Sequence, residues 1–166
     1  MFYYGRLIMN KNLQELYKAY KRYYIFEEDI NSMDDMLNNN YVYAWYSKTN
    51  PKKYFYVGRG KKQRYRHILW EIEALKNPRK YKGKPYKLLQ DAFGIECDFL
   101  YKDLTQKEAA ILELICIVEC IKNQQPLLNH IIPWNILDDL DEKYYQQWLK
   151  INYEVDEKIF LKYFTD

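Results

Sequence analysis

The amino-acid sequence predicts an α+β fold in which a small three-stranded sheet, antiparallel or mixed, is flanked by helices. Aromatic and small apolar residues alternate in residues 41–46 and again in 54–57, a pattern typical of β-strands. A third strand-like run, IECDFLY, follows at 95–101, and helical patterns precede, separate and follow the three runs. This order is typical of a small α+β sandwich with appended helices.

The first element that we expect is an amphipathic helix in residues 11–30. Five apolar or aromatic side chains share roughly one face of such a helix: Leu13, Leu16, Tyr17, Tyr20 and Tyr24. The run NSMDDMLNNN then predicts a short turn of helix and a loop. Residues 1–40 therefore form a predicted N-terminal helical extension.

A β-hairpin is expected next. The turn-rich run SKTNPKK separates the two alternating segments, so an antiparallel pair is the natural connection. Gly58 and Gly60 are expected to end the second strand, and a helix to run from about Lys62 to Lys76. These elements open a central domain that we place at residues 41–130.

The second half of this domain contains a basic loop, NPRKYKGKP, and a short predicted helix, YKLLQDAF, closed by Gly94. After the third strand, Thr105 and Glu108 have the spacing of a capping box. The helix that they open is apolar on most of its circumference, which predicts a central place in the core. Residues 131–166 form a predicted C-terminal helical extension, packed on or beside the same core.

Composition narrows the class of protein. The 166 residues suffice for one ordinary core, and no apolar run approaches the roughly 20 residues of a membrane helix. The start MFYYGRLIMNKN lacks the basic region and long apolar run of a signal peptide. The three cysteines (Cys97, Cys116 and Cys120) are an odd number without CxxC spacing. They favour reduced, buried thiols in an intracellular, cytoplasmic protein.

Charge is distributed unevenly along the chain. Residues 48–88 contain 14 Lys or Arg and two acidic residues, Glu71 and Glu73, whereas the net charge of the whole chain is only +3. This asymmetry favours a polyanionic partner, with nucleic acid first. The alternative is a solvated basic face, but such faces normally intersperse both signs.

Glu113 is an anomaly of the long apolar helix. It falls among apolar neighbours such as Ala109 and Cys116, where a carboxylate is costly unless it is paired or binds a cation. Spacing alone leaves two interpretations open with equal weight. One is a structural salt bridge to a lysine or arginine, and the other is a single metal-binding carboxylate.

The predicted helix after Gly60 also carries polar residues on one face. Arg64, His67 and Glu71 are spaced i, i+3 and i+7. Glycines and cations before a helix suit phosphate oxygens, although any tight strand-to-helix turn can require the glycines. His67 is interpreted with equal weight as an ordinary packed residue or as part of a site.

Tyr43 and Tyr56 differ from the other tyrosines. Most of the 19 tyrosines must be packing residues, but paired strands can bring these two hydroxyls together beside the basic turn. A tyrosine hydroxyl has a pKa near 10, and nearby cations lower it. We therefore expect the local surplus of Lys and Arg to lower the pKa of this pair.

Several short motifs together resemble the GIY-YIG nuclease family. They are YVY at 41–43, YVG at 56–58 and RGKKQRYRH at 59–67, and the resemblance continues through residues 86–121 to PLLN at 126–129. It covers roughly residues 41–130 in the family's order of hairpin, arginine helix, third strand, glutamate helix and asparagine. Three departures are visible: YVY replaces GIY, Lys62 replaces a second glycine, and NHIIPW lacks a glycine-rich continuation.

The resemblance implies a set of site residues. The catalytic residues would be Tyr43, Tyr56, Arg64, His67, Glu113 and Asn129. Glu113 would be the ligand of one Mg²⁺ or Mn²⁺ ion, which favours the metal interpretation of this carboxylate. Five cations would bind nucleic-acid phosphates: Arg59, Lys61, Lys62, Arg66 and Lys87.

The activity that the resemblance implies is endonucleolytic hydrolysis of DNA. Tyr43 would act as the base, Arg64 as a phosphate clamp and Glu113 as the metal ligand. The DNA would be double-stranded or branched and read with modest sequence preference, because neither flank carries a basic recognition helix. A homodimeric restriction enzyme stays open, and the flanking helices are candidates for contact with another protein. The rival hypothesis is a catalytically silent nucleic-acid-binding or scaffold protein that keeps the fold.

Overall fold

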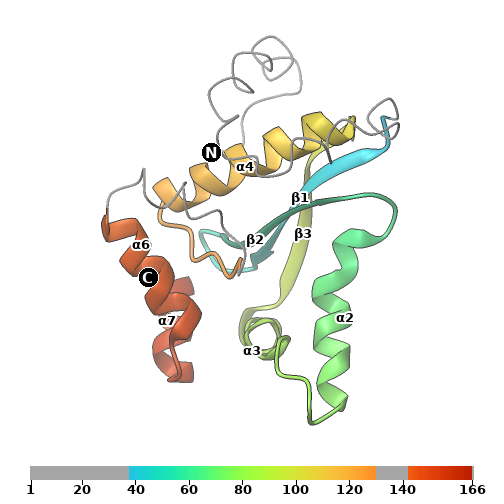
Figure 1. The fold of residues 1–166 in the computed structure, drawn as a ribbon. Helices are drawn as coiled ribbons and strands as arrows, with labels where there is room; N and C mark the ends of the chain where they lie inside the picture. The colour runs from blue at the N-terminus through green and yellow to red at the C-terminus, as the bar shows by residue number, and fades with distance from the viewer. Residues whose placement is uncertain (1–37, 130–141, 166) are drawn as a thin grey trace.

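A computed structural model describes residues 38–129 and 142–165 of the chain (Figure 1). Within these residues a three-stranded antiparallel sheet is flanked by helices, which confirms the predicted α+β class. The helix expected in residues 11–30 and the boundary expected near residue 130 lie outside the described residues.

The sheet has the strand order β2-β1-β3. The central strand β1 (Asn40–Ser47) pairs antiparallel with β2 (Lys53–Gly60) on one side and with β3 (Ile95–Leu104) on the other. The predicted hairpin and third strand are thus confirmed. β2 is longer than the expected segment 54–57, because Gly58 still pairs with Tyr43, and Gly60 with Tyr41.

The segment after β2 differs from the prediction. A short 3₁₀ helix, η4 (Arg64–Arg66), leads into α2 (His67–Glu73) and a second 3₁₀ helix, η5 (Ala74–Lys76). The expected helix start near Lys62 is wrong. Lys62 has a φ of 50°, in the left-handed region, so its backbone cannot belong to a right-handed helix.

The next two helices are confirmed, although the first begins at Lys84, inside the expected loop, rather than at Tyr86. α3 (Lys84–Phe93) is closed by Gly94, whose φ of 79° suits a residue without a Cβ. α4 (Gln106–Lys122) begins with the capping box: Thr105 Oγ1 accepts from the Glu108 N–H at 3.1 Å, and Glu108 Oε1 accepts from the Thr105 N–H at 3.0 Å.

The sheet separates two apolar cores, because successive side chains of β1 point to opposite faces. Val42 and Ala44 pack in one core with the apolar face of α4. Tyr41, Tyr43 and Trp45 pack in the other, together with residues of α2 and α3. In Figure 1, α4 accordingly crosses the sheet on one side, and α2 and α3 lie on the other.

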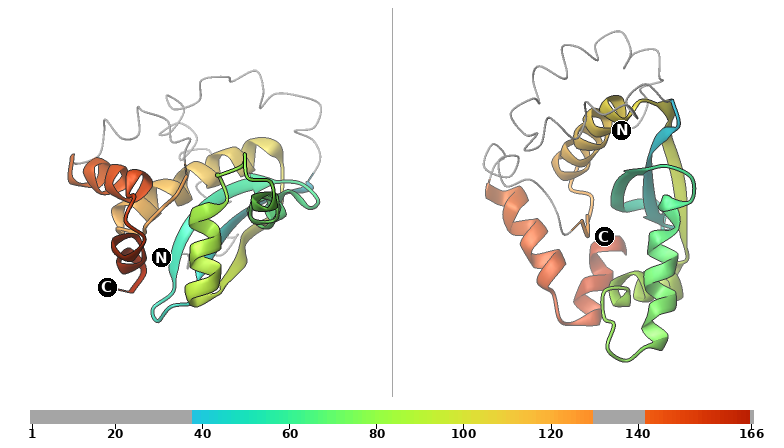
Figure 2. Two further views of the ribbon diagram at one scale, coloured as in Figure 1. Left: turned by 90° about the horizontal axis from the view of Figure 1, so that it is seen from below. Right: turned by 45° about the vertical axis from the view of Figure 1, so that its right-hand side comes forward.

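Two C-terminal helices, α6 (Glu142–Tyr153) and α7 (Glu157–Thr165), complete the described fold. They confirm the helical character expected there for residues 142–165. Trp148 of α6 joins the core beneath α4, while Phe160 and Phe164 of α7 join the core that contains α3. Figure 2 shows both helices beyond α3, which lies between them and α2.

Two further expectations concern the whole chain. Among the residues that the structure describes, no helix combines the length and apolarity that crossing a membrane requires. Cys116 and Cys120 are free thiols buried in the core, as expected, whereas Cys97 is a free thiol that is only partly buried.

Candidate functional site

Tyr43, Tyr56 and His67 form a cluster on the face of the sheet that carries α2. The two tyrosine rings are stacked with their centroids 6.2 Å apart. The His67 ring lies 4.6 Å from that of Tyr56 and 6.0 Å from that of Tyr43. The structure therefore brings together three of the six predicted catalytic residues, from β1, β2 and α2.

His67 is buried but incompletely satisfied. Its Nε2 atom has no hydrogen-bond partner among the described residues. Its Nδ1 atom lies 3.9 Å from Glu71 Oε1, which is beyond hydrogen-bonding distance. A buried polar nitrogen without a partner costs free energy unless water or a ligand engages it. His67 thus has a buried, unpartnered Nε2 atom on a ring that lies beside the two tyrosines.

Two glycines make room for the site residues. A Cβ on Gly58 would lie 2.6 Å from the Tyr43 hydroxyl oxygen and 2.9 Å from Cε1 of Tyr56. A Cβ on Gly60 would lie 2.6 Å from Cβ of Arg64. Real Cβ atoms do not approach other atoms this closely, so any side chain at either glycine would displace a predicted site residue.

The turn that carries Arg64 is fixed by two β1 side chains that the sequence analysis did not single out. The Tyr41 hydroxyl lies 2.9 Å from the Lys62 carbonyl oxygen, to which it donates, and accepts from the Tyr65 N–H at 3.0 Å. Trp45 Nε1 donates to the Tyr65 carbonyl at 2.9 Å. Alternate residues of a strand share a face, so Tyr41 and Trp45 lie on the same face of β1 as Tyr43. This alternation is the sequence pattern that could have identified the two residues.

Glu113 lies where α4 contacts the end of β2. Its Oε1 atom is 3.8 Å from Nε of Arg59, and 27% of its side chain is exposed. The ion pair that one of the two interpretations of Glu113 expected is therefore present. Burial raises the pKa of Glu113 to about 7, although the guanidinium and backbone N–H of Arg59 lower it. One partly exposed arginine does not compensate the desolvation of this carboxylate.

Charges from opposite faces of the sheet act on the tyrosine pair. The charge of Glu113 raises the pKa of both Tyr43 and Tyr56, and that of Arg64 lowers it. Glu113 on α4 and Arg64 on η4 therefore lie close enough to influence the two hydroxyls. Five of the six predicted catalytic residues belong to this arrangement.

The expected lowering of the tyrosine pKa values is wrong. Burial, the largest cause for both residues, raises the pKa of Tyr56 to about 12 and that of Tyr43 further above its usual value. Arg64 is exposed to solvent, whereas Tyr43 is fully buried, so the cation cannot offset the desolvation. Tyr43 is thus a neutral hydroxyl near neutral pH.

Glu113 is the residue that could hold a metal. Residues 38–129 and 142–165 contain no group of three or more His, Cys, Asp or Glu side chains suited to a metal ion. Mg²⁺, however, is commonly held by one or two carboxylates, with water and substrate phosphates as its other ligands. A carboxylate with a pKa raised by burial gains from a nearby cation. The described residues therefore fit a one-carboxylate site but not an all-protein cage.

Asn129 holds the outer edge of β2. Its Oδ1 accepts from the Val57 N–H at 3.1 Å, and its Nδ2 donates to the Val57 carbonyl at 2.8 Å. The residue is buried, and Trp148 Nε1 donates to its backbone carbonyl at 3.1 Å. Both ends of the Asn129 amide are therefore engaged. The structure gives this residue the position of a support for the strand that carries Tyr56.

The five predicted phosphate-binding cations fall into two groups. Arg59, Lys61, Lys62 and Arg66 lie at the end of β2 and in the following turn, beside Arg64. All of these except Lys61 are classed as exposed, and Lys61 is partly buried. Lys87 belongs to α3, where its Nζ atom donates to Asp91 of the same helix at 3.0 Å.

A separate cavity of about 360 Å³ lies between α3 and the two C-terminal helices. All three helices contribute residues to its lining, among them Tyr86, Ile151 and Phe160. None of the six predicted catalytic residues lines this cavity. It is therefore distinct from the cluster around Tyr43.

Comparisons with known proteins do not add to this geometry. No family model matches the chain, and searches of curated proteins and of solved structures find no significant match. The resemblance to the GIY-YIG nucleases therefore remains a hypothesis based on the motif residues themselves.

Proposed function

We propose that the protein is a divalent-metal-dependent endonuclease of the cytoplasm that hydrolyses DNA phosphodiester bonds. The observation that carries the proposal is the convergence of Tyr43, Tyr56, Arg64 and Glu113, which come from four different elements. The two tyrosine rings stack 6.2 Å apart, Arg64 packs against Gly60 at the end of β2, and Arg59 of the same strand lies 3.8 Å from Glu113. Packing alone does not require a carboxylate and an arginine around a buried tyrosine and its partly buried neighbour. The same four residues occupy positions of the family motifs.

The charged residues have complementary roles in this proposal. Arg64 would bind the non-bridging oxygens of the scissile phosphate through its planar, permanently charged guanidinium. Glu113 would hold one Mg²⁺ ion, which polarises the phosphate and stabilises the departing oxygen. Arg59, which contacts Glu113 at 3.8 Å, is then available to a DNA phosphate.

The neutral residues would handle the attacking water. Because burial keeps Tyr43 protonated, its hydroxyl serves to orient the water, and a tyrosinate base is not required. His67 Nε2, which has no partner among the described residues, would accept a hydrogen bond from the same water and take its proton as the water attacks the phosphorus. Tyr56, whose ring lies 6.2 Å from that of Tyr43 and 4.6 Å from that of His67, would complete the wall of the site.

A second candidate is a nucleic-acid-binding protein without catalytic activity. The specific observation in its favour is the ion pair between Glu113 and Arg59, which gives the carboxylate a structural role without a metal. This protein would bind DNA through the same basic turn and would not cut it. Metal-dependent cleavage separates the two candidates.

The test is incubation of supercoiled, linear and branched DNA with the full chain, in Mg²⁺ and in chelator. We expect cleavage in Mg²⁺ only, and loss of cleavage in Arg64→Ala and Glu113→Ala. Absence of cleavage on every substrate, or equal cleavage by both variants, would contradict the proposal. Salt-dependent DNA binding by a protein that never cuts would support the second candidate instead.

A further inference from the structure

Trp70 is an aromatic side chain that the core does not account for. It lies on α2 and is 49% exposed, whereas His67 and Ile68 of the same helix are buried. A single exposed apolar residue is ordinary in itself. A large flat aromatic gains significance where its surroundings match a particular ligand, because it offers wide contact area at small entropic cost.

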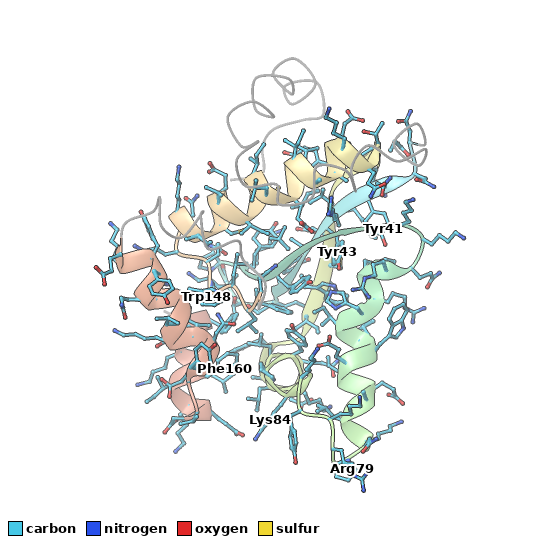
Figure 3. The ribbon with its side chains drawn as sticks, viewed as in Figure 1. Tyr41, Tyr43, Arg79, Lys84, Trp148 and Phe160 are labelled. Carbon is cyan, nitrogen blue, oxygen red and sulfur yellow. The ribbon has the colours of Figure 1, made fainter. Side chains whose placement is uncertain are left out.

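The surroundings of Trp70 are strongly basic. Residues 59–66, just before α2, contain five Lys or Arg and no acid, and residues 76–84, just after it, contain another five and no acid. Arg66 and Trp70 are four residues apart and so lie on neighbouring turns of one helical face. In Figure 3, Arg79 lies at the opposite end of α2 from Tyr41, which anchors the first basic turn.

The two acidic residues of α2 do not interrupt this surface. Glu71 is two-thirds buried and faces His67, with 3.9 Å between Oε1 and Nδ1. Glu73 is more exposed, but its carboxylate pairs with the Lys76 ammonium. The outer side of α2 therefore presents the Trp70 indole between two groups of cations. The exposed acidic residue nearest to the indole, Glu73, is already paired with Lys76.

The dimensions and the ring chemistry indicate a nucleic-acid strand. The ten residue steps from Arg66 to Lys76 span about 15 Å along a helix, or about four nucleotides at about 3.4 Å each. A duplex shows this surface mainly sugar and phosphate, and its bases are already stacked on one another. An exposed indole can stack only on a base that is unpaired and accessible.

We propose that the outer face of α2 binds an unpaired segment of the DNA, with one base stacked on Trp70 and phosphates on the cations at either end. This inference rests on the proposed function and names its substrate class. The substrate is DNA with a single-stranded tail or branch, held so that its phosphate chain leads to the turn that carries Arg64.

The test is binding of labelled DNA in chelator, so that cleavage plays no part. A duplex with a single-stranded tail is compared with a blunt duplex of the same length. We expect Trp70→Ala to weaken binding of the tailed duplex roughly 5- to 150-fold, the effect of losing one stacked base, and to change binding of the blunt duplex less than about two-fold. Trp70→Phe should restore most of the affinity.

Tyr153→Ala is the matched control. Tyr153 is also an exposed aromatic residue, at 73%, but it ends α6, which α3 separates from α2. It should leave both affinities unchanged. Equal binding of the tailed duplex by wild type and Trp70→Ala, or an equal loss on both DNAs, would overturn the inference.

The outcome is separable from that of the proposed function. A protein that binds tailed DNA through Trp70 but never cuts in Mg²⁺ supports this inference and contradicts the nuclease. A protein that cuts DNA while Trp70→Ala binds and cuts like wild type supports the nuclease and contradicts this inference. Circular dichroism and thermal unfolding confirm that each variant is folded.

Discussion

The Tyr43 hydroxyl occupies the space where a side chain on Gly58 would begin. The two residues are partners across β1 and β2, and only 2.6 Å separates the hydroxyl oxygen from the position of a Cβ at Gly58. The absence of a side chain on one strand thus determines where the tyrosine of the next strand can lie.

Gly58→Ala is expected to displace Tyr43 or Tyr56 and to reduce DNA cleavage at least about ten-fold. Overpacking of this kind costs about 1–3 kcal/mol of unfolding free energy. Gly94→Ala is the control, because its φ of 79° and ψ of 153° lie in a region that only glycine adopts readily. A side chain there costs about 1–3 kcal/mol at the end of α3, away from the tyrosines. Urea unfolding and cleavage rates per folded molecule should show comparable destabilisation but lost activity only in Gly58→Ala. Equal activities would show that Gly58 does not position the pair.

Tyr41→Phe is expected to loosen the turn that carries Arg64. The change removes the hydroxyl that bonds the Lys62 carbonyl and the Tyr65 N–H, at a cost of about 1–2 kcal/mol. Because this turn carries Arg64, the affinity for DNA, measured in chelator, should fall together with the stability. Tyr46→Phe removes an exposed hydroxyl that donates to Glu96 at 2.6 Å, and should change stability by less than about 0.5 kcal/mol. Unchanged DNA affinity in Tyr41→Phe would assign this hydroxyl to stability alone.

The metal-free protein is expected to lose stability as pH rises from 5 to 8. Folding raises the pKa of Glu113 to about 7 from an ordinary 4.5, so between these values the folded state binds more protons than the unfolded chain. The unfolding free energy therefore decreases with pH in this range. Full desolvation would make the loss about 3 kcal/mol, and the 27% exposure of the side chain reduces our expectation to about 1–2 kcal/mol.

The measurement is urea unfolding in chelator at pH 5 and pH 8, for wild type and Glu113→Gln. The difference between the two proteins isolates this carboxyl from the other titrating groups. Wild type should lose more stability than the variant over the range. A pH dependence identical in both proteins would mean that Glu113 ionises as in an unfolded chain.

Arg59→Gln is expected to strengthen metal binding while weakening DNA binding. The Arg59 guanidinium lies 3.8 Å from Glu113 and competes with any cation for its charge. Electron paramagnetic resonance of Mn²⁺ should show tighter binding to the variant without DNA, and anisotropy should show weaker DNA binding. Lys52→Gln is the control, since Lys52 forms an exposed ion pair with Asp98 at 2.7 Å. Weaker Mn²⁺ binding by Arg59→Gln would contradict this competition.

Local sequence patterns predicted much of the fold. Alternation gave the strands, and the spacing of Thr105 and Glu108 gave the start of α4, because both depend on residues close in sequence. The start of the helix after β2 was predicted wrongly. Its position depends on the left-handed backbone at Lys62 and on the hydroxyl of Tyr41, which is distant in sequence.

The sequence predicted which residues form the candidate site, but it did not predict the direction in which the tyrosine pKa values shift. The motifs identified Tyr43, Tyr56, Arg64 and Glu113, which the structure places within mutual influence. The direction of the tyrosine pKa shifts could not be read from nearby lysines and arginines, because those side chains extend into solvent while Tyr43 is buried. Burial is a property of the folded chain, and it outweighs sequence proximity here.

Magnesium-dependent cleavage of DNA by Glu113→Gln and by Glu119→Gln, side by side with wild type, tests the central claim most directly. Both residues lie on α4, and both changes keep side-chain size while removing one negative charge. Wild type and Glu119→Gln should cut a tailed or branched DNA at similar rates, and Glu113→Gln should be slower by on the order of 100-fold or more. Equal rates for all three proteins, or no cleavage by wild type, would contradict the assignment of this protein as a nuclease with Glu113 at its metal site.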